Sequence, residues 1–90
     1  MKTLPPNLTA YRRTPTFTEA NVPKGLLADH TTKAGTWGVI TVESGRLDYT
    51  ITGTGETVIL EPGTNGIVEP EELHHVTPVG AVAFYVEFWR

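Results

Sequence analysis

The chain has no cysteine, a single serine and no long apolar run, and each scarcity excludes a class of protein. Without cysteine there is no disulfide framework, no zinc finger, no iron–sulfur site and no thiol nucleophile. The serine, Ser44, is expected in a turn, and nothing around it resembles a Ser-His-Asp arrangement. No run approaches the ~20 apolar residues of a membrane span, and no signal-peptide core is visible near the start. We therefore expect a cytoplasmic protein without membrane contact.

Basic charge is equally scarce. Seven Lys and Arg face ten Asp and Glu, which gives a net charge of -3, and only Arg12 and Arg13 are adjacent. A nucleic-acid-binding surface needs a basic stripe that displaces counterions from phosphates, and no such stripe exists here. With 90 residues the chain is long enough for one small domain, so we expect a single domain over 1–90.

β-Branched residues dominate what remains. Thr, Val and Ile together supply 28 of the 90 residues, and Gly and Pro interrupt the chain at short intervals. Such side chains suit a pleated sheet, and short strands between Gly/Pro turns are typical of a sandwich or barrel. The fold class that we predict is therefore all-β, a small antiparallel β-barrel.

The predicted strands follow the alternation of apolar residues between the turns. They cover 25–31, 36–43, 46–52, 56–60, 66–69, 74–77 and 81–89, and the last should lie buried in the sheet centre. The turn at 43–46 predicts a hairpin between its two neighbours. Residues 1–21 are expected to form an irregular arm with one extended piece around 8–13, before a barrel over 22–90. The best helix candidate, 17–21, is too short to stand alone.

Three histidines carry the chemistry of this sequence. His30 lies in an early predicted strand, whereas His74 and His75 lie in a late one. An early and a late histidine can converge inside a barrel, and imidazole is the commonest metal ligand in proteins. Because side chains alternate along a strand, His74 and His75 should point to opposite faces. The alternative is ordinary: a histidine on a strand is more often a packed or surface residue than a ligand.

Two segments around these histidines resemble a known family. Residues 30–38 are similar to the His-x-Thr-Lys-x-Gly-x-Trp-Gly segment of the small cupin-like domain at the N-terminus of TehB-type tellurite-resistance proteins, which also occurs in YeaR-like stand-alone proteins. Residues 68–76 resemble the Val-Glu-Pro-x-x-x-His-x-Val segment of that domain. The stretches 39–49 and 84–88 resemble its hairpin and its terminal strand. The resemblance covers essentially the whole chain.

This resemblance implies a cupin-type barrel (a jelly roll), often dimeric, with a pocket inside one end. His30 and His74 match the two motif histidines. Cupins generally take two His and one Glu from the first motif, whereas this chain has a single His there and residues 31–33 where a second could stand. A third ligand would have to come from Glu69, Glu87, His75 or water. The methyltransferase part of TehB-type proteins has no counterpart here, since no Gly-rich strand-to-helix loop is present.

Other residues near these motifs have more than one interpretation. Lys33 could attract an anion at the pocket mouth or be a solvated lysine. Trp37 could line the pocket, fill the core or lie at a dimer interface, and Trp89 is expected to pack or to lie at an interface. Glu87 could be a metal ligand, could orient a histidine, or could point outward together with Tyr85. The candidate pocket residues are Lys33, Trp37 and Tyr85.

Two classes of function follow. The first is a binding or stress-response module whose pocket holds a divalent metal, zinc or nickel, or a small anion such as an oxyanion, linked by family to tellurite resistance. The second is a metal-dependent enzyme, a dioxygenase or isomerase of the cupin kind, using iron or manganese. The incomplete ligand set favours the first. A homodimer is expected, built from the arm and an outer sheet face.

Overall fold

The computed structural model describes residues 3–90, and nearly all of its regular structure is strand. The helix α1 contains only 4 residues. The predicted all-β class is therefore confirmed. The elements in chain order are β1 (Ala10–Arg13), β2 (Phe17–Thr18), α1 (Lys24–Leu27), β3 (Trp37–Ile51), β4 (Glu56–Leu60), β5 (Gly66–Val68) and β6 (His74–Trp89).

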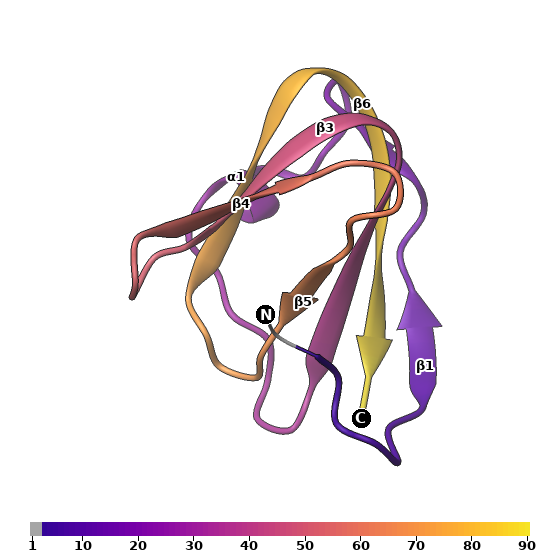
Figure 1. Ribbon diagram of the computed structural model, residues 1–90, viewed down its shortest axis with the longest axis vertical. Helices are drawn as coiled ribbons and strands as arrows, with labels where there is room; N and C mark the ends of the chain where they lie inside the picture. Colours follow the sequence, from indigo (N-terminus) through magenta and orange to yellow (C-terminus); the bar gives the residue numbers. More distant parts are fainter. Residues whose placement is uncertain (1–2) are drawn as a thin grey trace.

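All strand pairs are antiparallel and belong to one sheet in the order β1-β6-β3-β4, with β2 also on β6 and β5 also on β3. Strand β6 lies in the centre, as its apolar sequence predicts. Figure 1 shows β3 and β6 curving over together, so that the two halves of each strand face one another across the interior. Within residues 3–90 the end strands β1 and β4 do not pair, so the sheet is not closed.

The predicted hairpin at 43–46 is wrong. Strand β3 continues through this segment, and both of its halves pair with β6. The register shifts on either side of Ser44 and Gly45, and Gly45 has a φ of +80°. An irregularity of this kind bends a strand without reversing it. The sharp reversal comes later, at 52–55, where β3 and β4 form the hairpin.

The strand predicted at 25–31 is also wrong. Its first part is α1, and only His30 makes a bridge to a strand. The predicted arm contributes more to the sheet than expected, because β1 and β2 both pair with β6. Phe17 packs edge-on against Phe84 with ring centroids 5.8 Å apart. Residues 1 and 2 of the predicted arm lie outside the described residues.

The core lies between the facing halves of β3 and β6. The predicted inward residues Leu47, Tyr49 and Ile51 are all buried, and Phe84 is completely so. The same two strands also contribute Ile40, Val42, Val76 and Val82, and Leu60 of β4 and Val68 of β5 complete the cluster. No helix in the described part of the chain is long and apolar enough to cross a membrane.

Candidate functional site

A cavity of about 250 Å³ opens beside the core. Its lining combines aliphatic and aromatic side chains from the inner face of the sheet with polar side chains from the segment before β3. The lining residues are Thr14, Leu26, His30, Thr31, Thr32, Lys33, Thr36, Gly38, Ile40, Val68, His74, Val76, Phe84, Val86 and Phe88. Two of the sequence-predicted ligands, His30 and His74, and the predicted pocket residue Lys33 therefore meet at one cavity.

The two histidines are joined by their own backbones. The N–H of His30 donates to the carbonyl of His74 at 2.9 Å, and the N–H of His74 donates back at 3.0 Å. Their ring centroids are 4.1 Å apart. The segment before β3 and the start of β6 thus hold the two imidazoles together through main-chain bonds, independently of any ligand.

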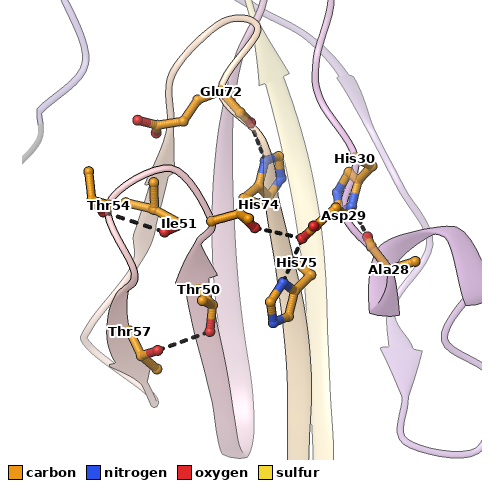
Figure 2. A network of polar contacts seen from close by, with 11 residues as sticks. Ala28, Asp29, His30, Thr50, Ile51, Thr54, Thr57, Glu72, His74 and His75 are labelled. Carbon is orange, nitrogen blue, oxygen red and sulfur yellow. Dashed lines mark hydrogen bonds and ion pairs between the residues drawn. The ribbon is translucent and has the colours of Figure 1, made fainter.

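Each imidazole is also oriented by a backbone carbonyl. The Nδ1 of His30 lies 2.9 Å from the carbonyl oxygen of Ala28, and the Nδ1 of His74 lies 2.7 Å from that of Glu72. Figure 2 shows both contacts as dashed lines. A carbonyl only accepts, so each Nδ1 carries the hydrogen, and in a neutral ring Nε2 is then the unprotonated nitrogen. Metal-ligating histidines generally have this arrangement.

Asp29, the chain neighbour of His30, contacts two residues outside the histidine pair. Its Oδ1 accepts hydrogen bonds from the hydroxyl of Thr52 at 2.6 Å and from Nδ1 of His75 at 2.9 Å. Figure 2 shows the contact between Asp29 and His75. The Thr52 hydroxyl first, and His75 second, lower the pKa of the Asp29 carboxyl. His75 therefore lies on the face opposite His74, as the alternation predicts, and ties the segment 28–30 to β6.

Tyr49 packs against His74 from the core, although it does not itself line the cavity. Its ring meets that of His74 edge-on at 5.6 Å, and its hydroxyl donates to the carbonyl of Ile67 at 3.1 Å. Burial raises the pKa of Tyr49, and the carboxylates of Glu72, Glu69 and Glu56 raise it further. The phenol therefore stays neutral and acts as a fixed hydrogen-bond donor rather than as an acid.

The two acidic candidates do not line the cavity. Glu87 lies on the outer face of β6, where its Oε2 is 3.1 Å from a guanidinium nitrogen of Arg13. Glu69 directly follows β5, and its backbone carbonyl lies 3.5 Å from the hydroxyl of Thr32. In residues 3–90 no three His, Asp or Glu side chains come together as a metal cluster.

The aromatic candidates also lie elsewhere. Tyr85 and Trp37 are not among the lining residues. Tyr85 stacks under the guanidinium of Arg13, 4.2 Å from its ring centroid, and Trp37 is the register partner of Trp89. The reason is strand alternation: in β6 the inward positions are Phe84, Val86 and Phe88, so their neighbours point out.

Sequence reasoning missed the apolar part of the site. The alternation of Phe84, Val86 and Phe88 is visible in the sequence, but the sequence does not say which of the two faces is hollow. Thr14 and Leu26 were missed because they come from the arm and α1, whose contacts with β6 are non-local. Thr14 pairs with Val86 in both directions, through its N–H at 2.9 Å and its hydroxyl at 3.0 Å.

Comparison with known proteins places this architecture in a family. The TehB-like domain family matches residues 12–86, which include both cavity histidines. The chain belongs to the TehB-like family. A probable S-adenosyl-L-methionine-dependent methyltransferase TehB from Haemophilus influenzae (strain ATCC 51907 / DSM 11121 / KW20 / Rd) is 36% identical over 74 residues. The corresponding protein of strain 10810 is 35% identical over the same length.

The two Haemophilus influenzae proteins are much longer than this chain. Each alignment covers 77% of this chain but only 26% of the relative, so the chain corresponds to about a quarter of these relatives. The crystal structure of TehB from Haemophilus influenzae superposes with a TM-score of 0.81 at 31% identity, over 91% of this chain and 31% of that one. A crystal structure of an Escherichia coli K12 protein gives 0.92 at 21% identity, over 100% and 97%, and shows the shared fold.

Proposed function

We propose that this TehB-like chain is a binding module of the cupin type, whose cavity holds one divalent transition-metal ion on the imidazoles of His30 and His74. The observation that carries the proposal is the paired arrangement: two rings 4.1 Å apart, each with Nδ1 donating to a carbonyl. Zinc and nickel suit imidazole ligands. The residues fit such an ion in part, since they supply two ligands and leave the remaining positions open.

The open positions suit a small anion, such as an oxyanion. Lys33 lines the cavity and no carboxylate does so among the described residues, so the charge of the lining is positive. The hydroxyls of Thr31 and Thr36 add hydrogen-bond donors to the lining, whereas the hydroxyl of Thr32 already donates to the carbonyl of Thr36 at 2.7 Å. The family link to tellurite-resistance proteins supports this assignment of ligand chemistry.

The direct test is isothermal titration calorimetry of zinc into chelator-stripped protein. We expect one zinc ion per chain, and His30→Ala or His74→Ala should weaken binding by at least tenfold, because each removes one of two protein ligands. His75→Ala is the matched control, since His75 faces Asp29 on the other side of the strand. A wild-type protein that takes up no zinc, or variants that bind as well as the wild type, would contradict the proposal.

A metal-dependent enzyme is the second candidate. The observation that favours it is the low number of protein ligands, because open positions on iron(II) or manganese admit oxygen or an oxygen-bearing substrate. Oxygen consumption by iron-loaded protein, lost in His74→Ala, would support the enzyme over the binding module.

We further propose a homodimer formed through β1 and the outer face of the sheet. Strand β1 is an edge strand, and all of its residues are exposed. A second copy can pair with the free side of this edge. Sedimentation equilibrium at high micromolar concentration should give twice the 9.8 kDa mass of one chain. A monomer mass would refute the dimer.

A further inference from the structure

The floor of the cavity is apolar over most of its area. Phe84, Val86 and Phe88 occupy successive inward positions of β6, and Ile40 and Val68 lie beside them on the neighbouring strands β3 and β5. Phe84, Ile40 and Val68 are already buried, whereas Val86 and Phe88 are only half-buried. An inorganic oxyanion bound at the histidines and Lys33 would leave Val86 and Phe88 against water. Apolar surface gains stability only when an apolar group covers it. The apolar floor therefore favours a ligand that has a hydrocarbon part.

The volume of the cavity limits the size of the ligand. A cavity of about 150 Å³ suffices for benzene, with its six carbon atoms. The cavity here measures about 250 Å³, so it has room for a ligand of roughly eight to ten non-hydrogen atoms. That is far larger than any simple oxyanion and far smaller than a nucleotide or a lipid.

The polar groups define the other end of the ligand. Lys33 is the one permanently charged side chain among the described lining residues, and it belongs to the same segment as His30. A carboxylate head could ion-pair with Lys33 and occupy an open position on the metal, since carboxylate oxygens are common ligands of divalent ions. One polar end and one apolar floor match a molecule with one charged head and one chain.

From this division we infer that the cavity binds a short linear aliphatic carboxylate of about five to eight carbons. The carboxylate lies at His30, His74 and Lys33, and the chain covers Val86 and Phe88. This inference rests on the proposed function for the position of the head group, whereas the apolar floor alone dictates the chain.

The test uses a series of carboxylates of increasing length, from acetate through butanoate and hexanoate to octanoate, titrated into zinc-loaded protein by calorimetry. Each methylene that enters the apolar floor contributes ~0.8 kcal/mol, which corresponds to roughly fourfold in affinity. From butanoate to hexanoate the affinity should thus rise about 15-fold. It should level off once the cavity is filled. Equal affinity along the whole series, or tellurite binding tighter than hexanoate, would overturn the inference.

Matched variants locate the chain and the head. Phe88→Ala and Val86→Ala should each reduce the gain per methylene, whereas Tyr85→Ala, next to Val86 but on the outer face of β6, should leave it unchanged. Lys33→Gln should weaken every member of the series by the same factor. A loss in Tyr85→Ala equal to that in Phe88→Ala would contradict the placement of the chain. Circular dichroism confirms that each variant folds, and having two floor variants guards against one failing to do so.

The same titrations separate this inference from the proposed function. Zinc binding with no dependence on chain length retains the metal site and refutes the carboxylate ligand. Length dependence that is equal with and without zinc, in a protein that binds no zinc, retains the aliphatic ligand and refutes the metal site.

Discussion

Zinc added to chelator-stripped protein is expected to raise its Tm by roughly 10–20 °C at neutral pH. An ion that binds only the folded state, at ~100-fold excess over its Kd, adds ~2.7 kcal/mol to the free energy of unfolding. In a domain of this size each kcal/mol corresponds to ~4–8 °C. The effect should be large because the two imidazoles are held together only when His30 and His74 are bridged, which the unfolded chain cannot do.

Variants and pH make this result specific. His30→Ala and His74→Ala should lose most of the rise, whereas His75→Ala should keep it. Protons compete with metal ions for imidazole nitrogen, so the rise should shrink below about pH 6. Differential scanning fluorimetry with and without zinc, between pH 5 and 8, measures both effects. A stripped wild-type protein with an unchanged Tm at neutral pH would mean that the histidines serve packing alone.

Gly45→Ala is expected to destabilise the fold by about 2–4 kcal/mol, a loss of roughly 10–25 °C in Tm. Gly45 has a φ of +80°, where a Cβ is strained, and an added Cβ would lie 2.1 Å from the backbone oxygen of Ala81. This oxygen belongs to the neighbouring strand and cannot move without breaking the bend of β6. Both strands would have to shift at the point where the sheet folds over.

Two other glycines serve as controls for Gly45. Gly55 also has a positive φ, +73°, but no atom within 4 Å of an added Cβ, so Gly55→Ala should cost only about 1 kcal/mol. Gly53 has open space and no positive φ, so Gly53→Ala should be nearly neutral. Thermal melts of the three variants should fall in this order. Similar Tm values for Gly45→Ala and Gly53→Ala would refute the role of the bend.

The sequence predicted the strand content and the inward faces because these follow from local alternation. Leu47, Tyr49 and Ile51 are buried as their period of two requires, and the adjacent His74 and His75 point to opposite faces for the same reason. It also predicted that His30 and His74 meet, from the resemblance of two separate motifs. Each of these features depends on a few neighbouring residues or on a motif.

The sequence did not predict features that depend on which strand lies opposite. The turn chemistry around Gly45 is compatible with a hairpin or a bend, and only the pairing of both halves with β6 decides between them. Residues 25–31 alternate like a strand, but no strand is available along their whole length, and α1 forms instead. Glu87 is a plausible ligand by composition, yet its strand face directs it to Arg13.

The pairing of β3 with β6 has a consequence for how fast the chain folds. It brings Trp37 next to Trp89 and Ile51 next to His74, so most of the sheet forms only after long loops have closed. Loop closure costs entropy before any contact repays it, and folds of this kind take milliseconds to seconds. The local hairpin of β3 and β4 can form early, whereas the bridge between His30 and His74 must wait for β6. A metal ion on that bridge would therefore slow unfolding while leaving the folding rate almost unchanged.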